Sequence, residues 1–214
     1  MDAVQKWVYE RKIHDCMKVL EEKGYDPIFA KDKDEAREIT MSLIPEGATI
    51  AVGGSVTLNE TGILDEIRSD KYNFIDRYNT SSFEEMLDKY REGYTADVMV
   101  SSVNAITMKG QLVNIDCTGN RSSQFVFGPK KVIIVAGANK IVETTEDGIA
   151  RAKSIAPMNA RRITHKTPCA TDDNCRCTDC NVHPRVCNVT SIVEGCTYFP
   201  KRITVVLVPE DLGY

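Results

Sequence analysis

The sequence predicts an α/β domain with a mostly parallel sheet and flanking helices. Segments with a strand pattern alternate with helical ones along the whole chain of 214 residues, which is typical of this class. The run 131–136 is continuously apolar, as expected for a strand buried on both faces of a parallel sheet. A strand at 48–52 leads directly into a Gly-Gly-Ser turn and a further helix. We therefore expect a single domain over 1–214.

Local signals predict the elements of the first half of the chain. Apolar residues at helical spacing from Val4 to Leu20, followed by Gly24 as a stop, indicate an N-terminal helical segment. Ser82 begins a capping-box pattern, which marks the start of a later helix. In chain order, the expected elements are a helical segment at about 1–24, strand 25–30, helix 32–43, strand 48–52, helix 58–67, strand 73–78 and helix 82–91.

The second half is expected to contain further strands, a helix and a loop rich in cysteine. The turn Lys109-Gly110 separates two of the strands. We find no internal repeat and no tract that resembles a linker. In chain order, the elements are strands 97–101, 111–115 and 131–136, helix 145–156, the cysteine-rich loop at about 167–188 and a last strand at 202–208.

The composition favours a cytoplasmic protein. Its net charge of -4, with 27% charged residues, argues against nucleic acid as the main partner, because phosphate binding needs a basic face. No apolar run approaches the roughly 20 residues of a membrane span, and the N-terminus lacks the apolar core of a signal peptide. In a reducing cytoplasm, clustered cysteines are more often metal ligands or redox groups than structural disulfides. A homodimer is expected because symmetric homo-oligomers are common.

The turn after the strand at 48–52 is a candidate ligand site. Gly53 and Gly54 let a ligand approach the backbone, and consecutive N–H groups at a helix start favour an anion. Ser55 and Thr57 add hydroxyl groups, and Glu60 is a candidate general base or nucleophile. The alternative is a plain tight turn that is followed by a solvated glutamate.

A second group of candidates follows the strand at 111–115, where open α/β sheets bind their ligands. Asp116 is a candidate acid–base group. Thr118, Gly119, Asn120 and Arg121 offer donors to a phosphate or carboxylate, and an arginine can bind such a group with two hydrogen bonds. The alternative is an Asx-turn at Asp116 with Arg121 on the surface.

Two more strand ends are expected to meet the same crevice. Lys140 follows the strand at 131–136, and Asn104 follows the strand at 97–101. Lys140 would reach a third side of the crevice. The alternative is a lysine that is only exposed to solvent at the edge of the sheet. Together with the two loops above, these residues predict a binding site for a small anionic ligand.

The loop at about 167–188 is a candidate metal site. Cys177-x-x-Cys180 has the spacing of a metal knuckle, and Cys169 and Cys187 lie outside it. Four thiolates suit a zinc ion or an iron–sulfur cluster equally, and the spacing does not distinguish them. Cys175 is an alternative ligand. A redox disulfide and metal-free thiols are the remaining interpretations.

Several motifs together resemble the LUD-domain family, of the lactate-utilisation protein C type. The resemblance covers nearly the whole chain. Its motifs lie at 52–62, 102–107, 110–116, 118–121, 127–133, 156–159, 167–169, 177–180 and 185–188. Within the family pattern, Cys117 stands where glycine is common, and Cys175-Arg176 is an extra pair before Cys177.

The resemblance implies a fold similar to the sugar-phosphate isomerase and CoA-transferase superfamily. It also implies a role in bacterial oxidation of lactate to pyruvate, with iron–sulfur partner proteins carrying electrons and this chain as an electron-transfer or accessory subunit. One alternative is an enzyme that acts on a phosphorylated or CoA-linked substrate, with Glu60 or Asp116 as its acid–base group. The other is a metal-binding scaffold without catalysis.

Overall fold

The centre of the protein is a parallel sheet of six strands. In the computed structural model, which describes residues 1–171 and 175–214, the strand order is β1-β10-β7-β4-β2-β3, and every neighbouring pair is parallel. This arrangement confirms the predicted fold class. The strands are β1 (Asp26–Phe29), β10 (Ile203–Val208), β7 (Lys131–Gly137), β4 (Val98–Ser101), β2 (Thr49–Val52) and β3 (Asn73–Phe74).

A second sheet, which the sequence analysis missed, lies beside the first. Its order is β8-β5-β6-β9, with β6 antiparallel to both of its neighbours. The predicted strand at 111–115 belongs to this sheet. Strands β5 and β8 have only three and two residues, so they carry little periodic signal. The strands are β8 (Ile141–Val142), β5 (Ala105–Thr107), β6 (Leu112–Asp116) and β9 (Val189–Val193).

Side-chain caps explain where the longer helices begin. Asp2, Asp32, Ser82 and Thr144 each accept hydrogen bonds from backbone N–H groups in the first turn. The predicted helix at 58–67 is instead two short helices, which Gly62 separates in a left-handed conformation (φ 72°). The helices are α1 (Ala3–Glu22), α2 (Lys33–Ser42), α3 (Val56–Glu60), α4 (Ile63–Ile67), α5 (Phe83–Glu92), α6 (Ser122–Val126), α7 (Thr145–Arg162) and α8 (Pro168–Thr171), with 3-10 turns η1 (Gly93–Thr95) and η2 (Ala138–Lys140).

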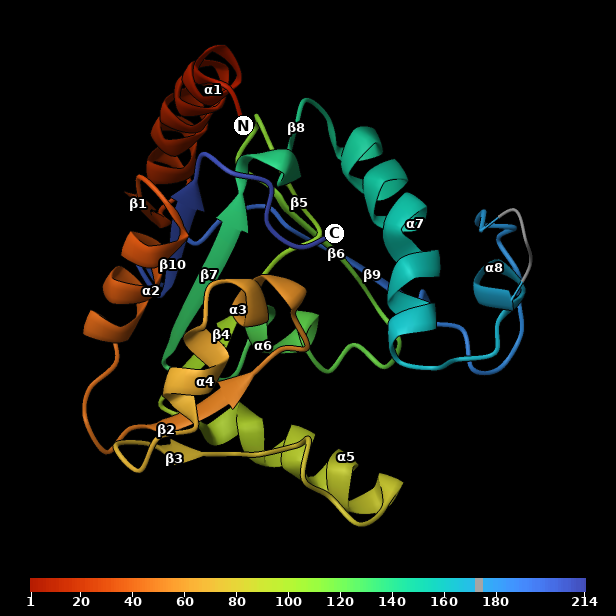
Figure 1. Cartoon of the computed structure of the whole chain (residues 1–214). Helices are drawn as coiled ribbons and strands as arrows, with labels where there is room; N and C mark the ends of the chain where they lie inside the picture. Colours follow the sequence, from red (N-terminus) through yellow and green to blue (C-terminus); the bar gives the residue numbers. More distant parts are fainter. Residues whose placement is uncertain (172–174) are drawn as a thin grey trace.

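Alternate residues of β7 face two separate cores. Val132 and Ile134 pack with α1 and the second sheet, whereas Ile133 and Val135 pack with α2, α3 and α4. Figure 1 shows α1 and α2 beside β1 and β10, with α7 lying toward the second sheet. The strand ends are therefore held by packing on both faces.

The cysteine-rich loop precedes the last strand, as predicted, although α8 and β9 also lie between α7 and β10. Residues 172–174 of this loop lie outside the described residues. Helix α7 continues through Pro157 to Arg162, beyond the predicted end at 156. Within the described part of the chain, no helix has both the length and the apolar character needed to cross a membrane.

Candidate functional site

A cavity of about 900 Å³ lies at the carboxyl ends of the parallel strands. Strands β2 and β4 end beside it, and η2 carries the chain from β7 to it. This is the edge at which open α/β sheets bind ligands. Helices α5 and α7 also contribute side chains to its walls. The lining includes these residues that the sequence analysis singled out: Gly54, Ser55, Thr57, Asn104, Asp116, Thr118, Asn120, Arg121 and Lys140.

Lys140 is a buried lysine on this cavity, with 4% of its surface exposed. Its Nζ lies 2.9 Å from Thr57 Oγ1 and 2.8 Å from Ser102 Oγ. Thr57 follows β2 and Ser102 follows β4, and β4 lies between β2 and β7 in the sheet. Two neutral hydroxyl groups, which follow β2 and β4, therefore hold the amine that follows β7.

The surroundings of Lys140 favour the neutral amine. Burial lowers the pKa of Lys140 from 10.5 to about 7, because desolvation disfavours the charged form. The nearby charges of Arg151 and Arg121 contribute to this lowered pKa, while Glu60 acts in the opposite direction. Near neutral pH, a large fraction of the amine is therefore unprotonated. Ionisable groups with strongly shifted pKa values are concentrated at functional sites.

Asp116 and Arg121 form a buried ion pair that engages most of their polar atoms. Arg121 Nε and Nη2 lie 2.9 and 2.8 Å from Asp116 Oδ1. Arg121 Nη1 donates to Ser102 O at 2.9 Å, and Nη2 also donates to Asn104 Oδ1 at 2.6 Å. Asp116 Oδ2 accepts a hydrogen bond from Ser122 N at 2.8 Å. This geometry favours a role in holding the loops together over acid–base chemistry or direct anion binding.

Glu60, the other predicted acid–base candidate, is exposed at the end of α3. Its Oε2 accepts a hydrogen bond from Gly213 N at 2.6 Å, so it fastens the C-terminal segment. A Cβ on Gly213 would lie 2.6 Å from Thr57 Oγ1 and 3.3 Å from Lys140 Nζ. The C-terminal backbone thus lies directly against the buried lysine. The described geometry gives Glu60 a structural contact and no direct place in the cavity wall.

Gly53 and Gly54 have different surroundings. A Cβ on Gly53 would overlap Ser101 Oγ and lie 3.0 Å from both Cγ and Cδ of Arg121. A Cβ on Gly54 would meet only the end of the Arg77 side chain, 2.5 Å from Nη2. Gly53 therefore allows the buried arginine to approach the backbone, whereas Gly54 leaves room for a side chain that faces the cavity.

We expect Gly53→Ala to lower the free energy of unfolding by about 1–3 kcal/mol, because the added methyl group would overlap Ser101 Oγ and press on Arg121. Urea denaturation measures this loss. Gly54→Ala is the matched control, since the tip of Arg77 can move away at small cost. Equal losses in the two variants would contradict the close packing of Arg121 on Gly53.

The remaining predicted binding residues occupy the rim of the cavity. Thr118 is exposed, and its Oγ1 donates to Asn120 Oδ1 at 2.9 Å. Gly119 takes a left-handed conformation (φ 77°) that makes the turn. Asn104 Oδ1 accepts from Ile115 N at 2.9 Å in addition to its contact with the buried arginine. These residues shape the loop and leave few side-chain groups free to bind a ligand.

Arg77 is a cavity residue that the sequence analysis missed. Its Nη1 donates to Tyr90 Oη at 2.9 Å and its Nη2 to Tyr78 Oη at 3.1 Å. The guanidinium carbon lies 4.4 Å from the centre of the Tyr78 ring, a cation–π distance. The sequence analysis placed Arg77 inside the predicted strand 73–78, whereas β3 ends at Phe74 and leaves Arg77 in the loop that follows.

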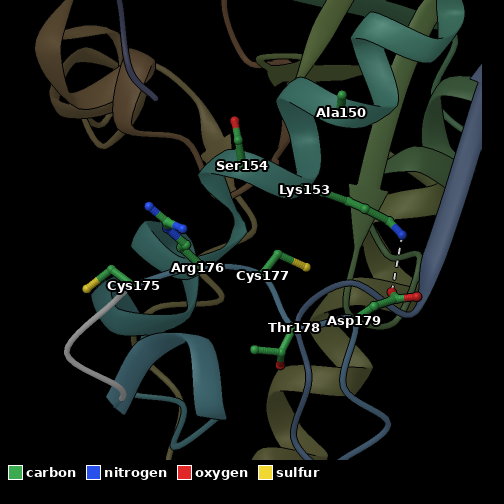
Figure 2. Close-up of a pocket in the computed structure, with 8 residues that line it drawn as sticks. All are labelled: Ala150, Lys153, Ser154, Cys175, Arg176, Cys177, Thr178 and Asp179. Carbon is green, nitrogen blue, oxygen red and sulfur yellow. Dashed lines mark hydrogen bonds and ion pairs between the residues drawn. The ribbon is translucent and has the colours of Figure 1, made fainter.

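The cysteine-rich loop forms a separate shallow groove against α7, with a volume of about 610 Å³ (Figure 2). Lys153 of α7 binds Asp179 of the loop at 3.1 Å. Figure 2 shows the thiols of Cys175 and Cys177 pointing in different directions along this groove. An ion pair thus attaches this part of the loop to α7. The later residues of the same loop, His183, Pro184, Val186 and Asn188, line the crevice.

The structure does not bring the described cysteines together as a set of metal ligands. Cys169 is buried, with its Sγ 3.3 Å from Thr167 Oγ1, and Cys187 Sγ accepts a hydrogen bond from Arg185 Nη2 at 3.4 Å. Among residues 1–171 and 175–214, no three Cys, His, Asp or Glu side chains converge as metal ligands would. The zinc or iron–sulfur assignment of Cys169, Cys177, Cys180 and Cys187 stays a prediction, which elemental analysis of protein purified without oxygen can test.

Cys117 links this loop to the crevice. It lines the cavity, and its Sγ donates to Arg185 O at 3.3 Å. Burial raises the pKa of the Cys117 thiol, and the nearby Asp116 and Cys187 raise it further. A thiol held in its protonated form is a weak nucleophile. The raised pKa of Cys117 therefore favours a packing role for this thiol over reaction with a ligand.

Comparison with known proteins places this geometry in a family. The LUD domain matches residues 13–208. Among solved structures, a DUF162 family protein from Deinococcus radiodurans has a similar fold, with a TM-score of 0.52 and 12% sequence identity over 94% of this chain and 97% of that one. No curated protein matches the chain. At this identity, the solved structure supports the fold alone.

Proposed function

This chain belongs to the LUD-domain family, and on that basis we propose that it serves lactate-type organic-acid oxidation by binding a small organic anion beside Lys140. The observation that carries the proposal is the environment of the amine. Lys140 lines the cavity with hydroxyl partners, and it forms no ion pair with a carboxylate of the described residues. A bound carboxylate would supply a negative charge that the hydroxyl partners of the amine lack.

The charges around the cavity support an anion. Arg77 lines it directly, held by two tyrosines. Arg151 lies close enough to lower the pKa of Lys140, and its own donors are bonded to neutral carbonyls, Asn139 O at 2.9 Å and Asn104 O at 2.6 Å. The positive charge of Arg151 is thus not cancelled by these hydrogen-bond partners. A small anion in the cavity would lower the electrostatic energy of this region.

Oxidation of an organic acid also needs an electron acceptor. We assign that part to iron–sulfur partner proteins and propose that this chain is the subunit that handles the organic acid. The proposal assigns no step to the cysteine-rich loop. It rests on the crevice alone.

A second candidate function is an enzyme that acts on a phosphorylated or CoA-linked substrate. The observation in its favour is the cavity volume of about 900 Å³, which is large for a three-carbon acid and near the upper range for drug-sized ligands. Tyr78 and Tyr90 beside Arg77 would offer aromatic surface to such a ligand. This candidate and the leading one differ in the ligand that binds.

We expect lactate or pyruvate to bind the wild-type protein in isothermal titration calorimetry, and Lys140→Met to weaken that binding by about 10–100-fold. This range corresponds to the loss of one charge-assisted hydrogen bond. Lys12→Met is the matched control, because Lys12 donates to Ile141 O at 2.6 Å outside the cavity. Binding of a phosphosugar or CoA without binding of either acid would favour the second candidate. Binding of none of these ligands would contradict the crevice assignment.

A further inference from the structure

The contacts of Lys140 suit a nucleophile better than a simple electrostatic anchor. The amine is almost fully buried, lines a cavity and contacts two hydroxyl groups, Thr57 Oγ1 and Ser102 Oγ. A hydroxyl group can either accept from an ammonium or donate to the lone pair of a neutral amine. The site therefore accommodates both protonation states without a structural change.

We propose that Lys140 forms an imine with the carbonyl group of a 2-oxo acid bound in the crevice. The inference rests on the proposed function, because it uses the same cavity and the same bound anion. Lysines that form such imines are activated by an apolar environment or by a neighbouring cation. Lys140 has both, since it is desolvated and lies near Arg121 and Arg151.

The reaction needs no further reagent. The lone pair of Nζ forms a bond to the carbonyl carbon, while the π electrons of the C=O bond move to oxygen, which takes up a proton. The resulting carbinolamine then loses its hydroxyl group as water, and nitrogen and carbon form a double bond. The sum is amine plus ketone giving imine plus water, without oxidation or reduction. Thr57 and Ser102 contact the nitrogen and are placed to pass protons between nitrogen and the departing oxygen.

The surroundings select the substrate class. An amine nucleophile requires an electrophilic carbon, which a 2-oxo acid has and a 2-hydroxy acid lacks. The positive charges of Arg77 and Arg151 favour a carboxylate next to that carbon. A protonated imine withdraws electrons from the carbon that is bonded to it on the side opposite the carboxylate. The hydrogens on that carbon, which form the methyl group in pyruvate, would therefore exchange with solvent.

The test is reductive trapping. Wild-type protein is incubated at pH 7 with pyruvate and sodium cyanoborohydride, and the intact mass is measured. We expect one adduct per chain, equal to pyruvate minus one water plus two hydrogens. Trypsin does not cut after a modified lysine, so the adduct should appear in a peptide that spans Lys140. Lactate is the matched ligand without a carbonyl group, and it should give no adduct.

Two variants and one spectroscopic measurement complete the test. Lys140→Met should lose the adduct, whereas Lys12→Met should keep it. In deuterated water, the wild-type protein should speed deuterium entry into the methyl group of pyruvate, which NMR detects without any variant. If calorimetry shows pyruvate binding but the adduct is absent or spread over exposed lysines, the imine is wrong and the binding proposal stands. If lactate binds but pyruvate neither binds nor reacts, the imine is wrong and the binding proposal stands. If neither acid binds and pyruvate does not react, both proposals fail.

Discussion

Replacing Asp116 by alanine is expected to lower the free energy of unfolding by about 3–5 kcal/mol. The substitution leaves Arg121 buried, at 9% exposure, without its charge partner. It also removes the acceptor of the Ser122 backbone N–H. Breaking one half of a buried pair is costly, because the remaining charge is poorly solvated. Urea denaturation followed by circular dichroism measures the loss.

Two comparisons make this prediction specific. Arg121→Met should also destabilise the protein, and the double variant Asp116→Ala with Arg121→Met should lose less than the sum, because it leaves no unpaired charge. Asp88→Ala is the matched exposed control, since Asp88 pairs with Arg91 on the surface of α5 and both are mostly exposed. If Asp116→Ala is no more harmful than Asp88→Ala, the ion pair does not hold the loops. If it folds stably but loses the pyruvate adduct, Asp116 takes part in the chemistry after all.

The position of the site could be predicted from the sequence because strand direction fixes it. In a parallel sheet, residues that follow different strands meet at one edge. Thr57 and Lys140 are 83 residues apart in the chain, yet they are in contact because β2 and β7 both end there. The apolar run of β7 indicated a buried central strand, and Lys140 lies in the 3-10 turn that follows this strand.

The roles within the site could not be predicted, because the same residue types suit an anion site and an internal ion pair. Asp116 and Arg121 are five residues apart around Gly119, and only the folded turn brings their side chains together. Likewise, nothing local marks β5 and β8 as partners. The strand Ile141–Val142 has two residues and pairs with Ala105–Thr107 only after η2 has turned the chain.

The cysteine-rich loop shows a similar limit. Its spacing suits a metal, but spacing along the chain does not determine where thiols point. In the folded loop, Cys187 contacts Arg185, and Lys153 holds Asp179 against α7. Asp179 also lies 3.6 Å from Arg185. The contact between Lys153 and Asp179 therefore connects the described part of this loop to α7, and the contact between Asp179 and Arg185 lies within the loop.

The charge state of Lys140 predicts a strong dependence of stability on pH. The pKa of Lys140 is about 7 in the folded protein and near 10.5 in the unfolded chain. Between these pH values the unfolded chain binds more protons, so stability rises with pH across this window. Below pH 7 the amine must be charged while buried, and the full penalty, roughly 4–5 kcal/mol, acts against folding.

Lys140→Met removes this penalty, because methionine has a similar length and no charge. We expect the unfolding free energy of the variant, relative to wild type, to be higher at pH 6.5 than at pH 10 by about 4 kcal/mol. Measuring each difference at the same pH cancels the groups that do not interact with the amine; the charges that act on it are those of Arg151, Arg121 and Glu60. Lys12→Met should show no comparable change with pH. If the difference in unfolding free energy between Lys140→Met and wild type is independent of pH, the amine keeps an ordinary pKa. Lys140 would then be protonated at neutral pH and unable to attack a carbonyl group.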